Sequence, residues 1–163
     1  MPATSLRIAS DVSKFRYAIA DASGRARGEL RMKTYPKDPI VLDFDGRPHR
    51  IDYALTRGGF VVDSFRFSLL DAAGGTLATG EKIAGKRAFV VSIADREYRF
   101  EKYGSLFSLR YALRDAGGGA VGTFADITGF SLWKRRFQVD LPADIDAAVG
   151  GFLCFLVVNL HFN

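Results

Sequence analysis

The chain has 163 residues, a net charge of +5 and one cysteine, Cys154. A chain of this length can bury roughly two thirds of the surface that it exposes when unfolded, so a single domain over residues 1–163 needs no disulfide or metal for stability. Residues 1–12 lack the apolar core of a signal peptide, and one cysteine forms no internal disulfide, so we expect a cytoplasmic protein. The modest charge does not by itself indicate nucleic-acid binding, which needs cations gathered on one face.

Three stretches follow one template: residues 16–24, 66–74 and 110–118. Each is a short run of alternating aromatic and aliphatic residues that reaches an Asp-Ala-x-Gly corner and then resumes. An Asp side chain accepts hydrogen bonds from the backbone of a corner, and Gly adopts positive φ without steric cost, so each stretch predicts a β-hairpin. A calcium site gathers several oxygen ligands within one loop, so we interpret the three aspartates as turn residues. They are Asp21, Asp71 and Asp115.

The rest of the first 140 residues predicts further short strands separated by turn residues, about twelve strands in all. Helical periodicity is absent there, which indicates an all-β barrel or sandwich. Pro48 suits a strand edge or a loop better than a central strand, and we place His49 in the same loop.

The last segment breaks the strand pattern. Pro142, Asp144 and Asp146 are typical of a helix start, and we expect a helix from about Ala143 to His161. No residue from 147 to 162 is charged when histidine is neutral, and apolar side chains cover every side of the helix, so it must be buried in protein or in lipid. The side chains expected in the core include Phe152, Leu153, Phe155, Leu156 and Leu160.

Burial inside the barrel is the favoured alternative, and a membrane tail anchor is the other. Residues 147–162 make about 24 Å of helix, short of the roughly 30 Å hydrocarbon core, and no basic cluster follows them. A barrel of about twelve strands also leaves a lumen that needs a plug. The sequence therefore predicts a closed antiparallel barrel around a buried C-terminal helix, with no transmembrane span.

The order of these elements resembles the tubby C-terminal-like superfamily, and most of all its LURP-one-related and phospholipid scramblase branches. The resemblance rests on the hairpins with Asp-x-x-Gly corners, on residues 137–146, and on the apolar run from Ala147 to Leu160. It implies a twelve-stranded barrel around a C-terminal helix. Tubby domains bind phosphoinositides and scramblases are associated with calcium and lipid movement. No stretch here matches the tubby headgroup site or an acidic calcium loop residue by residue, so no functional residue is carried over.

Catalytic and metal-binding groups are sparse. A nucleophile needs a neighbouring base and an orienting partner, yet the only histidines are His49 and His161. Cys154 lies among large apolar residues, where a thiol is expected to be an inert core group. We therefore expect no enzyme, no cofactor and no metal site.

Two basic features remain as candidate anion-binding sites. In the first, four cations share one strand face with Glu29: Arg25, Arg27, Arg31 and Lys33. In the second, Lys134 and Arg136 share a face, while Trp133, Arg135 and Phe137 alternate onto the other. A bulge, or an Arg135 that points to a barrel mouth, would explain an arginine between two aromatic residues. For each feature, a solvated outer strand face is the favoured alternative to anion binding.

These features predict a non-enzymatic binding domain for an anionic partner such as a phospholipid headgroup, and a headgroup partner would place the protein at the periphery of a membrane. A structural or protein-interaction barrel without a small ligand is the alternative.

Overall fold

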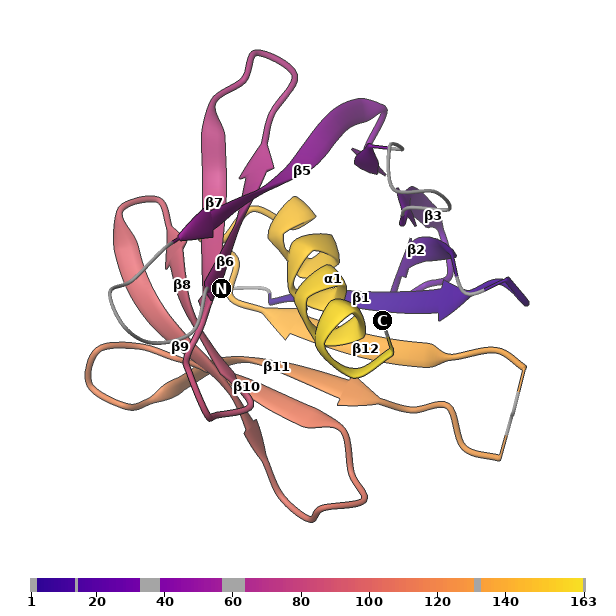
Figure 1. Cartoon of the computed structure of the whole chain (residues 1–163). Coiled ribbons are helices and arrows are strands. Elements are labelled where there is room, and N and C mark those ends of the chain that lie inside the picture. Colours follow the sequence, from indigo (N-terminus) through magenta and orange to yellow (C-terminus); the bar gives the residue numbers. More distant parts are fainter. Residues whose placement is uncertain (1–2, 14, 33–38, 57–63, 131–132, 163) are drawn as a thin grey trace.

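The computed structural model describes residues 3–13, 15–32, 39–56, 64–130 and 133–162. It consists of twelve strands that form a ring around one helix (Figure 1). The elements are β1 (Thr4–Ser10), β2 (Arg16–Asp21), β3 (Ala26–Arg31), β4 (Ile40–Phe44), β5 (Arg47–Thr56), β6 (Ser64–Leu70), β7 (Thr76–Lys82), β8 (Ala88–Ile93), β9 (Arg96–Tyr103), β10 (Arg110–Arg114), β11 (Ala120–Asp126), β12 (Arg136–Leu141) and α1 (Ala148–Phe162).

The strands form a closed antiparallel barrel. Each strand pairs with the next along the chain, and β1 pairs with β12 to close the ring. In that closing pair Thr4 lies opposite Leu141, and Ala9 lies opposite Arg136. Closure leaves no strand edge open for pairing with another chain. The predicted fold class is confirmed.

The three template stretches form three hairpins of the same kind, which recur at intervals of four strands around the ring. They make the β2–β3, β6–β7 and β10–β11 pairs. In each, the corner aspartate accepts hydrogen bonds from the turn backbone, such as 2.9 Å from the Ser23 N–H and 2.8 Å from the Gly75 N–H. Each second strand also carries a one-residue bulge, at Arg27, Leu77 or Val121. The interpretation of the aspartates as turn residues is confirmed.

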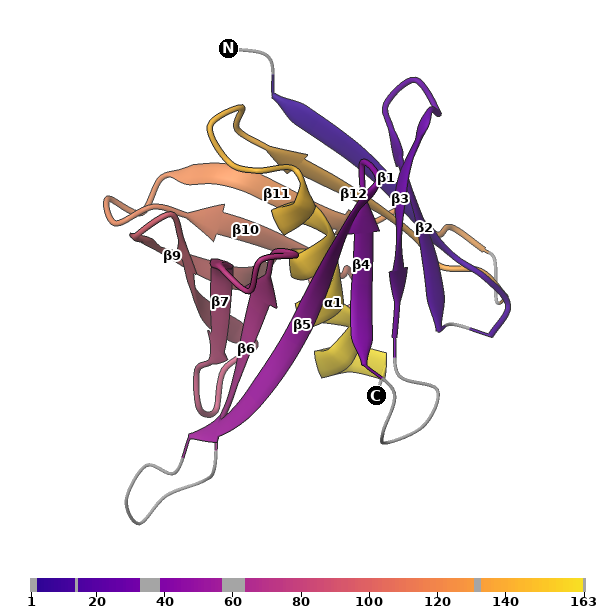
Figure 2. The same ribbon diagram turned by 90° about the horizontal axis from the view of Figure 1, so that it is seen from above.

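Because the strands run alternately up and down, successive connections lie at opposite ends of the barrel. We call one end the turn end: it holds the five tight turns 22–25, 45–46, 71–75, 94–95 and 115–119. We call the other the loop end: it holds the connections that follow β1, β3, β5, β7, β9 and β11. β1 begins at the turn end, and α1 ends at the loop end (Figure 2).

The helix runs through the barrel from the turn end to the loop end. It begins at Ala148, where the Asp146 carboxylate accepts a 2.9 Å hydrogen bond from the backbone N–H of Ala148. The predicted start near Ala143 is wrong, because residues 142–145 form a turn closed by the Ile145 N–H and the Pro142 carbonyl at 3.2 Å, with Ile145 buried. No helix among the described residues is long and apolar enough to cross a bilayer.

The helix forms the centre of the hydrophobic core. Phe152, Leu153, Phe155 and Leu156 are buried as predicted, and Leu160 is partly buried. The Phe155 ring packs edge-on against Phe67 of β6, with ring centroids 5.1 Å apart. A helix enclosed in this way contradicts the tail-anchor alternative.

The predicted loop around Pro48 is instead the first part of β5, paired with β4. Pairing of β5 with β6 begins only at Arg50, so the missing N–H of Pro48 interrupts no ladder on that side. His49 is also on this strand and is buried, with its Nδ1 within 3.2 Å of the Leu42 carbonyl and 3.0 Å of the Arg47 carbonyl.

Candidate functional site

Large hydrophobic side chains are exposed at the loop end. Twelve such side chains are exposed in the part of the chain that the structure describes, and all of them lie on loop-end connections, on the strand segments that enter them, or at the end of the helix. They are Val12, Phe15, Tyr53, Leu55, Phe65, Tyr103, Leu106, Phe107, Ile127, Phe130, Trp133 and Phe162.

Two neighbouring connections carry the most exposed of these residues. Leu106 and Phe107 are on the β9–β10 connection, and Phe130 and Trp133 are on the β11–β12 connection. Phe107 and Phe130 are fully exposed, and Trp133 is 72% exposed. Both connections leave adjacent parts of the ring, so their aromatic side chains project from one side of the loop end.

A row of aromatic rings connects the loop end with the core. Tyr53 and Phe65 are diagonal neighbours across the β5–β6 pair with ring centroids 6.2 Å apart, and Phe65 stacks on Phe67 at 6.4 Å. Phe67 in turn contacts Phe155 on the helix. The inner face of the β5–β6 hairpin thus stays apolar where it extends into solvent.

Charge is distributed unevenly between the two ends. Cations lie among the apolar residues of the loop end, on its connections and the adjoining strand ends. They are Arg16, Arg31, Lys82, Lys86, Arg87, Lys102, Arg110, Lys134, Arg135 and Arg136, and they outnumber the acidic residues of the same segments, Asp11, Glu81 and Asp126.

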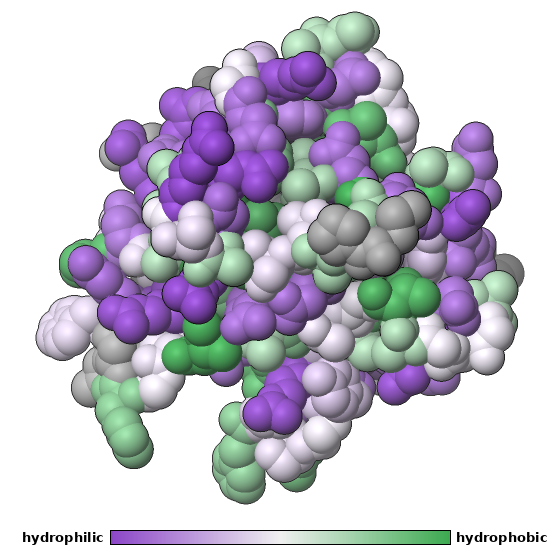
Figure 3. Space-filling model, turned by 180° about the vertical axis from the view of Figure 1, so that it is seen from behind, coloured by the Kyte–Doolittle hydropathy of each residue, from purple (hydrophilic) through white to green (hydrophobic). Residues whose placement is uncertain are grey.

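The turn end has the opposite character. It carries seven aspartates and Glu97, accompanied by Arg25, Arg27, Arg47, Arg96 and Arg114. Figure 3 faces this end and is dominated by hydrophilic residues, with hydrophobic ones confined to separate spots. The aspartates are Asp21, Asp45, Asp71, Asp95, Asp115, Asp144 and Asp146.

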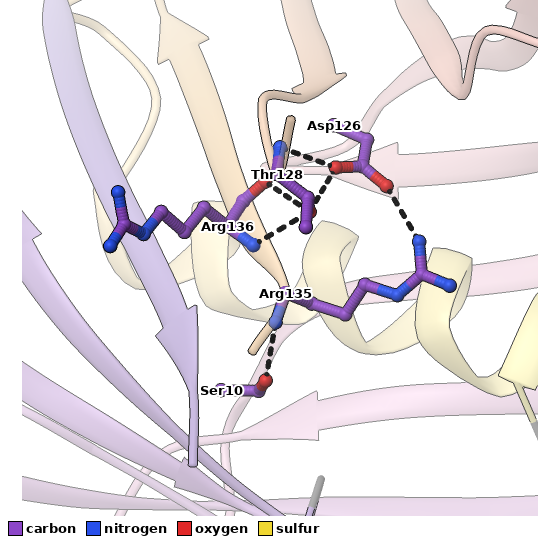
Figure 4. A network of polar contacts seen from close by, with 5 residues as sticks. All are labelled: Ser10, Asp126, Thr128, Arg135 and Arg136. Atoms are coloured by element: carbon purple, nitrogen blue, oxygen red, sulfur yellow. Dashed lines mark hydrogen bonds and ion pairs between the residues drawn. The ribbon is translucent and has the colours of Figure 1, made fainter. Parts of the chain in front are cut away.

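A polar network anchors the β11–β12 connection at the barrel mouth (Figure 4). The Arg135 guanidinium is 3.2 Å from the Asp126 carboxylate and lies 4.5 Å from the centroid of the Phe162 ring. The Arg135 backbone N–H donates to Ser10 Oγ at 2.8 Å, and the Arg136 N–H donates to Thr128 Oγ1 at 2.9 Å. These bonds fix the base of a connection whose aromatic side chains stay exposed.

The end of the helix is held by a second contact. Tyr111 Oη and His161 Nε2 are hydrogen-bonded at 2.7 Å. Burial raises the pKa of Tyr111 to about 12. Burial, together with the positive charges of Arg87 and Lys102, lowers the pKa of His161, so both groups are neutral near pH 7. Beside this pair is a hollow of about 520 Å³ between the β9–β10 and β11–β12 connections, bordered by Arg110, Arg135 and His161.

The first predicted basic feature is largely paired with acidic neighbours. Arg27 makes two 2.7 Å hydrogen bonds to the Asp45 carboxylate, and Arg31 is 2.8 Å from Asp43. The Arg27 guanidinium holds the pKa of Asp45 below its usual range. Arg25 is exposed near the turn end, and Lys33 lies outside the described residues. This face therefore presents little uncompensated positive charge.

The second predicted feature lies at the loop end. Lys134 and Arg136 are exposed, and Arg135 lies at the barrel mouth, which was one of the two explanations for its position between aromatic residues. β12 begins at Arg136 and buries Phe137, while Trp133 remains outside the strand. The sequence did not identify Phe107 or Phe130 as site residues.

Metal-binding and nucleophilic groups are sparse among the residues that the structure describes. No three His, Cys, Asp or Glu side chains gather there in a way that could hold a metal ion. Cys154 is fully buried, and burial raises the pKa of its thiol, so the nucleophilic thiolate is disfavoured.

No family model matches this chain, and neither a curated protein nor a solved structure is detectably similar to it.

Proposed function

We propose that this barrel is a non-enzymatic binding domain for anionic phospholipid surfaces, and that it binds them with the cations of its loop end. The observation that carries the proposal is the difference in charge between the two ends: among the described residues, lysines and arginines outnumber acidic residues at the loop end, and acidic residues outnumber arginines at the turn end. An anionic surface attracts the first end and repels the second, so the charges orient the molecule before contact. The resemblance to lipid-associated barrels motivates the same choice.

The cations best placed to contact an anionic surface are those with exposed side chains on the β9–β10 and β11–β12 connections or at the strand ends beside them. Arg110, Lys134 and Arg136 meet this description. Arg135 is half-buried and engaged with Asp126 and Phe162, so its first role is to hold the connection. Each basic residue near an anionic bilayer contributes about 1 kcal/mol to binding.

Removal of three loop-end cations is therefore expected to weaken binding to anionic vesicles. The triple variant Arg110→Gln, Lys134→Gln and Arg136→Gln should lose about 3 kcal/mol, or roughly 100-fold in affinity, at low salt. Sedimentation with phosphatidylserine-containing vesicles measures this. Raised salt should weaken binding of the unmodified protein as well, because it screens exposed charges.

The matched control removes the same number of charges from the turn end. The variant Arg25→Gln, Arg47→Gln and Arg96→Gln should bind nearly as well as the unmodified protein. Equal losses in both variants would indicate attraction by net charge without a defined site. Absence of binding to anionic vesicles would contradict the proposal and favour the structural or protein-interaction alternative.

A further inference from the structure

We infer that the loop end enters the bilayer, with the aromatic side chains of the β9–β10 and β11–β12 connections inserted beneath the lipid headgroups. This inference rests on the proposed function, since the cations bring the loop end to the surface. It adds an apolar contact that electrostatic attraction does not require. The inserted side chains are Leu106, Phe107, Phe130 and Trp133.

Exposure is the first argument for insertion. Water-exposed phenylalanine is unfavourable, and a monomeric protein seldom exposes a contiguous group of large apolar side chains unless they contact a membrane or a partner. Here such side chains lie at the loop end, while the tight turns at the turn end carry only Asp, Ala, Ser, Gly and Arg25. The exposed residues therefore mark one contact surface.

The chemistry of this surface favours lipid as its occupant. Phe107 and Phe130 stand fully exposed at separate connections, so a rigid protein partner would need a matched pocket for each, whereas a fluid lipid layer adapts to both. Cations accompany the apolar side chains in the way that interfacial membrane-binding segments combine them. Tyrosine and tryptophan prefer the level of the headgroups, and Tyr53, Tyr103 and Trp133 are all exposed at this end.

The fold limits how deep the insertion reaches. The Arg135 network holds the base of the β11–β12 connection, and a 2.9 Å hydrogen bond from the Asp126 N–H to the Leu109 carbonyl holds the end of the β9–β10 connection. The loops therefore enter while the barrel remains outside. Arg110, Lys134 and Arg136 then lie at the level of the phosphates. The hollow beside Arg110 and His161 opens toward the same layer.

Trp133 provides a direct test because it is the only tryptophan in the chain. Its fluorescence is measured with vesicles of phosphatidylcholine and phosphatidylserine, with and without a bromine quencher on the lipid tails. Insertion predicts a blue shift on binding and quenching by the tail bromines, both in proportion to the fraction of protein bound.

Two variants separate insertion from electrostatic attraction. The double variant Phe107→Ser and Phe130→Ser should lower vesicle affinity by at least about tenfold, because two phenyl groups no longer leave water. The control Ala72→Ser and Ala116→Ser places the same side chains at exposed turn-end tips and should bind normally. Thermal unfolding of both variants checks that the barrel is intact, as expected for exposed positions.

The outcomes distinguish the inference from the proposed function. Binding to anionic vesicles with an unshifted, unquenched Trp133 and an unaffected double variant would overturn insertion and leave electrostatic binding standing. Failure to bind any vesicle would overturn both. A protein that self-associates, and becomes monomeric in the double variant, would show that the loop end contacts a second copy of the chain instead of lipid.

Discussion

Phe155→Ala is expected to lower the free energy of unfolding by about 3–5 kcal/mol, the cost typical of a large-to-small change at a fully buried phenylalanine. Phe155 has no exposed surface and contacts Phe67 on β6 and Phe152 on the helix, with ring centroids 5.1 and 6.4 Å apart. Strands surround the helix, so they cannot move together to fill the space that the ring leaves. Denaturant unfolding followed by circular dichroism measures the loss.

A matched control exists on the same helix. Phe162 is 37% exposed and packs on Arg135 at the loop end, so Phe162→Ala should cost clearly less than Phe155→Ala. Removal of all residues after Pro142 is the extreme case, since it empties the barrel and exposes its inner face. A truncated protein that stayed monomeric and unfolded cooperatively would contradict the plugged-barrel fold.

Gly28→Ala is expected to be the most damaging single-methyl addition in the barrel. A Cβ at this position would lie 2.0 Å from the Asp43 carbonyl oxygen of β4, and backbone must move to relieve that contact. Overpacking of well-packed positions typically costs about 1–3 kcal/mol, and a clash with backbone belongs at or above the upper end of that range. The unfolding midpoint should fall accordingly.

Gly119→Ala is the control for this change. Its Cβ would meet only the Asp115 carboxylate at 3.4 Å, an ordinary contact, and Arg25 occupies the corresponding place in the first hairpin. Gly28 itself corresponds to Ala78 and Gly122 in the other two hairpins, so the position accepts only small residues. An unfolding midpoint of Gly28→Ala equal to that of Gly119→Ala would contradict the close approach of β3 to β4 at Gly28.

Local features made most of the fold predictable. The corner aspartates and glycines mark each hairpin because turn geometry depends on a few adjacent residues. The buried helix was predictable because side chains such as Phe152 and Leu160 leave it no polar face. Its start was misplaced because Pro142 and Asp144 also suit the turn that precedes a helix, and only Asp146 provides the cap.

The candidate site was harder to predict because it depends on which connections share an end. Phe15, Phe107 and Phe130 are far apart in the sequence and share the loop end only because every second connection of an up-and-down barrel lies at the same end. Sorting the predicted loops by that alternation would have grouped them. The pairing of Arg27 with Asp45 depends on the register between β3 and β4, and the alternation of residues within β3 does not predict that register.

The most direct test of this account asks which end of the barrel faces the bilayer. A polarity-sensitive fluorophore is attached to Ser23→Cys at the turn end or to Ser105→Cys at the loop end, while buried Cys154 stays unlabelled in the folded protein. The helix that joins the two ends spans about 22 Å, so only one label can enter a bilayer when the barrel stands on it. On anionic vesicles the account predicts a blue-shifted, tail-quenched label at Ser105→Cys and an unchanged label at Ser23→Cys. A response at Ser23→Cys, or the same response at both positions, would contradict it.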